Sequence, residues 1–131
     1  MPIRALLPGT FVVLASTGIL SCGSPIAPSS DAIATFRVVD ETFRVRLTMG
    51  EQVRAAQAAQ TGTGPRIPNG RIVSGTDVNA GWSWHLEDLE FADVTIEVCD
   101  GRPSDVERTG VTYGGGRFCP WAAEVVSIEE R

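Results

Sequence analysis

The first alternating pattern of apolar and polar residues begins after residue 34. Phe36 and Val38 flank one arginine, and three further apolar residues alternate with arginines up to Leu47. Asp40 and Glu41 separate the two runs, so the pattern predicts a β-hairpin with one buried face. The arginines on the other face form either a solvated surface or a basic stripe.

A helical pattern follows directly. Residues 51–60, EQVRAAQAAQ, are rich in alanine, which predicts a helix to about Gln60. Thr48 and Glu51 have the spacing of a capping box, in which the hydroxyl and the carboxylate each accept a backbone N–H of the first turn. The apolar stripe of this helix is small, so we expect it to pack closely on a sheet; the stripe consists of Met49, Val53 and Ala56.

The helix is followed by a segment that predicts no regular structure. Residues 61–69 are rich in glycine, threonine and proline, which is typical of a loop. Asn69 and Gly70 then predict a turn that leads into a short strand over residues 71–74.

Two further strand patterns surround the acidic part of the chain. In residues 82–87, WSWHLE, alternate positions face opposite sides of a strand. Trp82, Trp84 and Leu86 share one face, where the tryptophans are core anchors or, if exposed, a platform for carbohydrate. His85 and Glu87 share the other face. The clearest alternation in the chain comes next and predicts a strand whose apolar residues are Val94, Ile96 and Val98.

The last third of the chain predicts three smaller elements. Pro103 begins a short helix that ends near Arg108, and residues 110–117, which include three consecutive glycines, predict a flexible loop. A final strand is expected over residues 121–128, with Val126 and Ile128 facing inward. Together the patterns predict a single α+β domain, a small antiparallel sheet with one main helix packed on it.

The beginning of the chain is not part of this domain. Arg4 precedes an uncharged stretch of apolar and small residues that is too short and interrupted for a membrane span, which indicates a secretory signal. Cys22 follows Ile-Leu-Ser as in a bacterial lipobox and predicts diacylglycerol attachment; an ordinary signal peptide cut nearby is the alternative. We expect a lipoprotein signal peptide over 1–21, a flexible tether over 22–33 and the domain over 34–131.

With Cys22 assigned to the lipid, Cys99 and Cys119 remain as an even pair in an oxidising compartment. A disulfide between them would close a loop of about twenty residues and contribute about 3 kcal/mol in the chain-entropy model. The alternative is a metal-binding or nucleophilic pair. Neither cysteine has a histidine or a second cysteine at ligand spacing, so the disulfide is the main prediction.

Charge and titratable residues narrow the range of functions. The formal net charge of −5 argues against nucleic acid as a partner. His85, the only histidine, is interpreted as a hydrogen-bonded structural residue or as a ligand or metal contact. Converging carboxylates could bind calcium or hydrolyse glycosides, but the spacing matches no EF-hand, so no cofactor is expected and calcium is the minority hypothesis. The carboxylates concerned are Glu87, Asp88, Glu90, Asp93 and Glu97.

Four short motifs together carry a family resemblance over roughly residues 34–126. They are GRIV at 70–73, WSxHL at 82–86, EVCD at 97–100 and CPW at 119–121. With them the chain resembles the BP seventy-four N-terminal domain family, small and mostly bacterial secreted domains named after a calmodulin-binding protein of an amoeba. The resemblance implies a small α+β domain with Cys99 and Cys119 paired, and no settled activity. The predicted helix lacks a basic amphipathic pattern, so the sequence gives no support for carrying calmodulin binding over.

The expected function is therefore a non-enzymatic binding or interaction module, exported and lipid-anchored to a bacterial membrane or cell surface. Its partner would be an unknown protein or small ligand, and the candidate ligand-binding residues are Trp82, His85 and Glu87. The alternative is a small extracytoplasmic hydrolase that uses His85 with a carboxylate such as Glu87. A deep pocket that holds both would favour the enzyme, whereas a shallow surface with His85 buried would favour the module.

Overall fold

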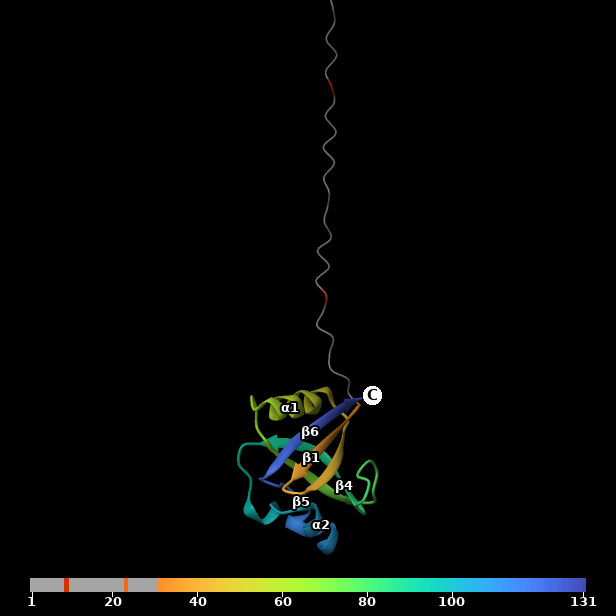
Figure 1. The fold of residues 1–131 in the computed structure, drawn as a ribbon, viewed down its shortest axis with the longest axis vertical. Helices are drawn as coiled ribbons and strands as arrows, with labels where there is room; N and C mark the ends of the chain where they lie inside the picture. Colours follow the sequence, from red (N-terminus) through yellow and green to blue (C-terminus); the bar gives the residue numbers. More distant parts are fainter. Residues whose placement is uncertain (1–8, 10–22, 24–30) are drawn as a thin grey trace, which may run out of the picture.

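The computed structural model describes residues 31–131 together with Gly9 and Gly23. The predicted signal peptide apart from Gly9, the lipid site at Cys22 and most of the predicted tether lie outside the described residues. The first strand begins at Ala32, before the expected domain start at Ala34. The elements in Figure 1 are β1 (Ala32–Val38), β2 (Glu41–Leu47), α1 (Gly50–Thr61), β3 (Ile67–Ser74), β4 (Trp84–Ala92), a 3₁₀ turn (Glu97–Cys99), α2 (Pro103–Thr109), a second 3₁₀ turn (Tyr113–Gly115), β5 (Arg117–Phe118) and β6 (Ala123–Glu130).

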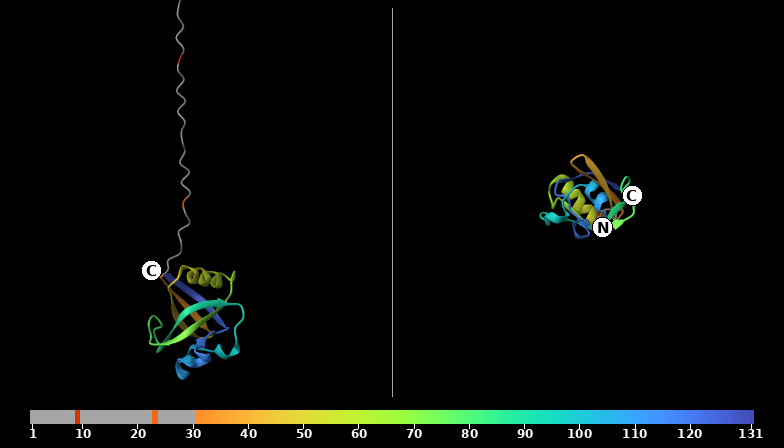
Figure 2. Two further views of the ribbon diagram at one scale, coloured as in Figure 1. Left: turned by 180° about the vertical axis from the view of Figure 1, so that it is seen from behind. Right: turned by 90° about the horizontal axis from the view of Figure 1, so that it is seen from below.

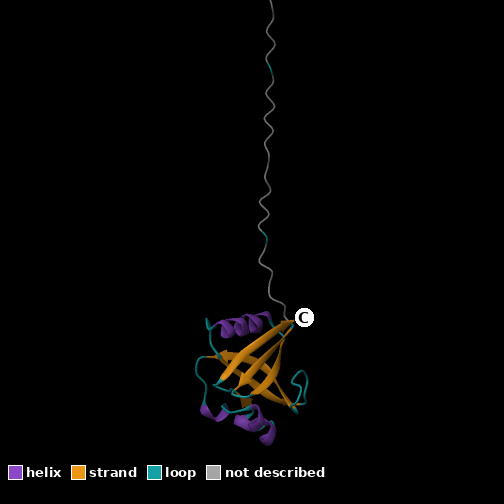
Figure 3. Ribbon diagram, in the orientation of Figure 1, coloured by secondary structure: helices purple, strands orange, loops and turns teal. Residues whose placement is uncertain are grey.

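The strands of the described region form two antiparallel three-stranded sheets. One has the order β2-β1-β6 and the other the order β4-β3-β5. The strands of the two sheets cross (Figure 3), and residues from both contribute to one apolar core. Helices α1 and α2 lie at opposite ends of the sheet pair (Figures 1 and 2). The predicted α+β class, with antiparallel strands and one main helix, is confirmed, although the strands divide between two sheets.

The predicted hairpin is formed by β1 and β2, which pair over their full length. Alternation along both strands brings Phe36 and Phe43 into the core, where their rings stack with centroids 5.0 Å apart. The outer face is a solvated, ion-paired surface, because each arginine reaches a carboxylate: Arg37 with Glu124, Arg44 with Glu129, and Arg46 with Asp77 and Asp31.

Helix α1 confirms the predicted helix, but its first turn is capped differently. The expected capping box of Thr48 and Glu51 is wrong, because Gln52 occupies the third helical position. The Gln52 Oε1 atom accepts the backbone N–H of Thr48 at 2.9 Å and that of Met49 at 3.2 Å. Two residues of the predicted apolar stripe are buried in the core, Val53 and Ala56.

The predicted loop after α1 ends earlier than expected, because β3 begins at Ile67. Asn69 and Gly70 therefore lie inside a strand, and the turn predicted at these residues is wrong. A β-bulge between Asn69 and Arg71 interrupts the ladder with β4. Glycine suits this position because a Cβ at residue 70 would lie 2.9 Å from the Cβ of Leu86 on β4.

The clearest alternation in the sequence does not form a strand, so that prediction is wrong. Ala92, the last residue of β4, pairs with Ile67, the first residue of β3, so β4 has no further partner on that side. The chain runs on irregularly into the 3₁₀ turn that ends at Cys99. The alternating apolar residues stay in solvent, with exposures of 83% for Val94, 68% for Ile96 and 61% for Val98.

The C-terminal third confirms the helix at Pro103 and a final strand, β6, which starts at Ala123 rather than at residue 121. The expected glycine loop contains the second 3₁₀ turn and ends as the short strand β5. Because β5 pairs with β3, it joins the end of this loop to the second sheet.

A β-bulge changes the faces of β6. Its register with β1 shifts, so that Phe36 pairs with Val125 and the preceding residue pairs with Ser127. Val126 is left without a partner across the ladder and is exposed, which makes the prediction that it faces inward wrong. Val125 packs against the core in its place, together with Ile128 as predicted.

Candidate functional site

A polar groove around His85 lies between the end of β2, the first turn of α1, the connection between β3 and β4, and β4 itself. Its volume is about 430 Å³. We call it the His85 groove. Most of its lining side chains are polar or charged, and they are Arg46, Thr48, Gln52, Asp77, His85, Glu87 and Asp88, with the apolar Leu86.

The imidazole of His85 is held at both ring nitrogens. Its Nδ1 atom lies 2.7 Å from the backbone carbonyl oxygen of Gly75, and its Nε2 atom lies 3.1 Å from Oε1 of Glu87. Both partners are acceptors, so only the doubly protonated ring can donate to both at once. The side chain is 14% exposed. His85 is therefore a fixed, mostly buried group at the wall of the groove.

The β-bulge in the β3–β4 ladder, whose extra residue lies on β4 opposite Asn69 and Arg71, brings two consecutive carboxylates to one arginine. Adjacent strand residues normally point to opposite faces, but Asp88 has a left-handed φ of 53°. As a result Arg71 donates through its terminal nitrogen to Glu87 at 2.8 Å and through Nε to Asp88 at 3.1 Å. These two carboxylates raise the pKa of Arg71, and the arginine fixes the carboxylate that contacts His85.

The lining of the groove also includes a second ion pair. Arg46 donates to the two carboxylate oxygens of Asp77 at 3.2 and 3.4 Å. These hydrogen bonds lower the pKa of Asp77 and, in turn, raise the pKa of Arg46. Desolvation opposes both shifts. The groove is thus bordered by charged groups that are positioned before any ligand arrives.

The structure brings together two of the three candidate ligand-binding residues and separates the third. Trp82 is absent from the lining of the His85 groove. It is half-buried, its Nε1 donates to the backbone carbonyl of Thr42 at 2.8 Å, and its ring packs 6.2 Å from that of Trp84. Trp84 itself is a core residue, as the anchor interpretation predicted.

The acidic run does not converge on one point. Glu87 and Asp88 border the His85 groove, whereas Asp93 and Glu97 are exposed beyond the end of β4. Within residues 31–131, no cluster of three or more histidine, cysteine, aspartate or glutamate side chains could hold a metal ion. Calcium binding stays a minority prediction of the sequence.

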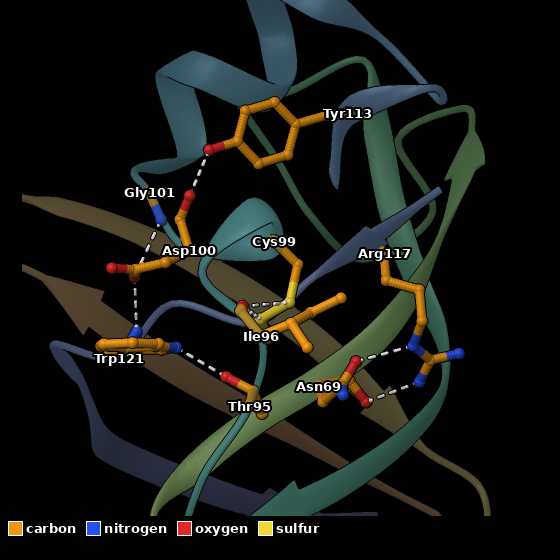
Figure 4. The surroundings of a disulfide bond; sticks show 10 residues. Asn69, Thr95, Ile96, Cys99, Asp100, Gly101, Tyr113, Arg117 and Trp121 are labelled. Carbon is orange, nitrogen blue, oxygen red and sulfur yellow. Dashed lines mark hydrogen bonds between the residues drawn. A yellow bond between two sulfur atoms is a disulfide. The ribbon is translucent and has the colours of Figure 1, made fainter. Parts of the chain in front are cut away.

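Cys99 and Cys119 form a disulfide with their Cα atoms 5.1 Å apart, which excludes the metal-binding and nucleophilic alternatives for this pair. A polar network surrounds it (Figure 4). The carboxylate of Asp100 accepts the backbone N–H of Trp121 at 2.7 Å, and the hydroxyl of Tyr113 donates to the Asp100 carbonyl. The indole of Trp121 donates to the hydroxyl of Thr95 at 2.6 Å.

The sequence patterns did not single out several residues that build the site. Arg46 was one of the hairpin arginines interpreted as a solvated face or a basic stripe. Arg71 was only the first residue of a predicted strand, and Asp77 lay in an irregular polar segment. Asn79 lay in the same segment, yet it is fully buried. The one available signal was the alternation of arginines on the outer face of β2, which suggested a charged surface but not its partners.

Comparison with known families matches residues 30–131 to the model of the BP seventy-four N-terminal domain. No curated protein and no solved structure matches the chain.

Proposed function

Because the chain belongs to the BP seventy-four N-terminal domain family, we propose that it is a small extracytoplasmic binding module rather than an enzyme. The module would be lipid-anchored through Cys22 and would bind a protein or small ligand at the His85 groove. The family match supports the fold and says nothing of an activity, so the proposal rests on the residues of the groove. Trp82 lies outside the groove, so the proposed binding site is centred on His85 and Glu87.

The observation that carries this proposal is the double engagement of His85. A general base needs a free ring nitrogen that faces the substrate. In the groove, Nδ1 lies against the Gly75 carbonyl and Nε2 lies against Glu87, which Arg71 holds. Charged groups that are fixed on strands and braced by neighbours are the arrangement that recognition requires.

Export and anchoring are supported by the sequence. The leader has the charge and apolar pattern of a secretory signal, and Cys22 stands where a lipobox cysteine stands. Among residues 31–131, neither helix has the length or the apolar character needed to span a bilayer. A disulfide within the domain agrees with an oxidising compartment.

A hydrolase is the second candidate, and one observation favours it. His85 and Glu87 are in contact, and Arg71 orients the carboxylate, which resembles a base held by an orienting acid. For this function Glu87 would have to turn away from Nε2 so that the ring nitrogen could face a substrate.

A photocrosslinking experiment in the native host tests the binding function. A photoreactive amino acid at Thr48, an exposed residue of the groove, should yield discrete adducts that disappear in the His85→Gln variant. The same amino acid at Val39, an exposed turn residue away from the groove, is the control. Adducts that are identical at both positions would overturn the proposal. Hydrolysis of chromogenic esters or glycosides that is lost in both His85→Gln and Glu87→Gln would favour the hydrolase.

A further inference from the structure

A second groove lies beside the His85 groove, between the first turns of α1 and the far half of β4. Its volume is about 450 Å³, within the range of small-ligand and side-chain pockets. Its apolar lining includes Met49, Leu89 and Phe91. Leu89 is buried and Phe91 half-buried, whereas Met49 is 46% exposed at the start of the helix. This α1–β4 groove therefore offers the apolar surface of Met49 and Phe91, with the buried Leu89 at its floor.

The spacing between the helix and the strand is fixed by a single buried amide. The Nε2 atom of Gln52 donates to the backbone carbonyl of Leu89 at 3.1 Å. Its Oε1 atom accepts the N–H groups of Thr48 and Met49 at 2.9 and 3.2 Å. The Nε2 end thus connects α1 to β4, and the Oε1 end caps the start of α1 itself. The floor of the groove is preformed, and its apolar residues remain the surface that a ligand would contact.

The rim of the groove is acidic. Glu51, Asp88 and Glu90 all belong to its lining, and the lining contains no basic residue. Glu51 and Glu90 form no ion pair within residues 31–131, and Asp88 shares Arg71 with Glu87. Glu51 lies in the first turn of α1, where the positive end of the helix dipole stabilises its negative charge. The rim consequently keeps a negative charge around the apolar floor.

This combination selects the chemistry of a partner. An anionic ligand would meet repulsion at the rim, and a neutral apolar ligand would desolvate unpaired carboxylates without compensation. We infer that the α1–β4 groove binds a peptide segment of a partner protein in which an apolar side chain is flanked by arginine or lysine. The apolar side chain contacts Met49 and Phe91 above the buried Leu89, and the flanking cations pair with Glu51 and Glu90.

The inference goes beyond the proposed function, because it concerns a different groove and is independent of export, lipidation and His85. Gln52 and Asp88 border both grooves, so a longer partner segment could extend from one into the other. A failure of crosslinking at Thr48 would leave this inference standing, and a failure of peptide binding would leave the proposal for the His85 groove standing.

The test uses the purified full chain and a short fluorescent peptide in which leucine and phenylalanine alternate with arginine. Fluorescence anisotropy should show saturable binding. A peptide with serine in place of the apolar residues, and one with glutamate in place of arginine, should each bind at least about tenfold more weakly. Absence of binding at about 1 mM peptide, or equal binding of the serine peptide, would overturn the inference.

Variants locate the binding on the protein. Glu51→Gln with Glu90→Gln should weaken binding about tenfold, and Met49→Ser should weaken it several-fold. The matched control is Asp93→Asn with Glu97→Gln, which removes the same charge from exposed residues outside both grooves. Equal weakening by the control pair would mean attraction by net charge alone and would overturn the assigned site. If a variant fails to fold, the comparison of the three peptides on the unmodified chain decides.

Discussion

The buried side chain of Asn79 donates a hydrogen bond to the backbone carbonyl of Trp84 at 2.8 Å. Its Oδ1 atom accepts the backbone N–H of Arg44 at 2.8 Å, so one amide connects a strand of each sheet. In the described region β2 and β4 belong to different sheets and share no ladder. Asn79 therefore satisfies two backbone groups that strand pairing leaves open at this crossing.

Replacing Asn79 by alanine is expected to lower the free energy of unfolding by about 2–4 kcal/mol, because two backbone groups lose their buried partner. Urea denaturation followed by tryptophan fluorescence measures the change. Gln57→Ala, an exposed amide on α1, is the control and should cost less than about 0.5 kcal/mol. Equal effects of the two variants would contradict the bridging role of Asn79.

Two isoleucines test whether the alternating segment after β4 contributes to the stability of the fold. Ile33 is buried in β1, whereas Ile96 is 68% exposed. Ile33→Ala should destabilise the domain by about 2–5 kcal/mol, and Ile96→Ala should change stability by less than about 0.5 kcal/mol. Thermal unfolding of both variants gives the comparison. A large loss in Ile96→Ala would show that the segment is packed and that the sequence pattern was right.

The disulfide is expected to stabilise the whole domain. Cys119→Ser should cost about 2–5 kcal/mol, as the loss of a native disulfide does in small secreted domains. Hydrogen exchange should increase first between residues 101 and 118, the segment that the disulfide closes. A reductant should reproduce the effect in the unmodified chain and have none in the double variant Cys99→Ser with Cys119→Ser. Unchanged stability in Cys119→Ser would contradict the prediction.

The Arg46–Asp77 pair predicts a defined dependence of stability on pH. Hydrogen bonds from Arg46 lower the pKa of Asp77 in the folded state. The folded state therefore favours the ionised carboxylate, so its contribution is present above the ordinary aspartate pKa and is lost as the pH falls through the lowered value. Between pH 7 and about pH 2, the melting temperature should fall less in the Asp77→Asn variant than in the unmodified chain. Parallel curves for the two proteins would count against a stabilising pair.

Lipid attachment predicts the behaviour of the chain in its host. Cys22→Ala should release the protein from the membrane fraction or block its processing, because a diacylglycerol-bearing cysteine is the expected anchor. Fractionation with immunoblotting measures the first effect, and intact-mass analysis of the mature protein measures the second. An unmodified mature chain that begins at another residue would end the lipoprotein prediction.

The elements that the sequence predicted correctly depend on neighbours in the chain. The hairpin follows from alternation on both sides of Asp40 and Glu41, and α1 follows from an alanine-rich run with a small stripe. Pro103 marked the start of α2 because its missing N–H is not needed there. The pairing of Cys99 with Cys119 followed from the predicted export signal and from the even number of cysteines left once Cys22 is set aside.

The failures in the strands and at the site have long-range causes. Val94, Ile96 and Val98 alternate as in a strand, but they follow Ala92, which pairs with the first residue of β3. Beyond that point β3 offers no partner. Val126 faces solvent because a bulge against β1 shifts its register. At the site, the ion pairs of Arg46 and Arg71 join residues that are far apart in the chain or are brought together by another bulge. Periodicity carries no information about any of these.

The close approach of Gly70 to Leu86 also limits how related sequences can diverge. With only 2.9 Å between the Leu86 Cβ and the place where a side chain at residue 70 would begin, no side chain fits at residue 70 unless the backbone of one strand moves. Every residue except glycine carries a Cβ, so a smaller residue at position 86 does not remove this contact. We expect position 70 to stay glycine in the lineage of this domain, whichever residue occupies position 86.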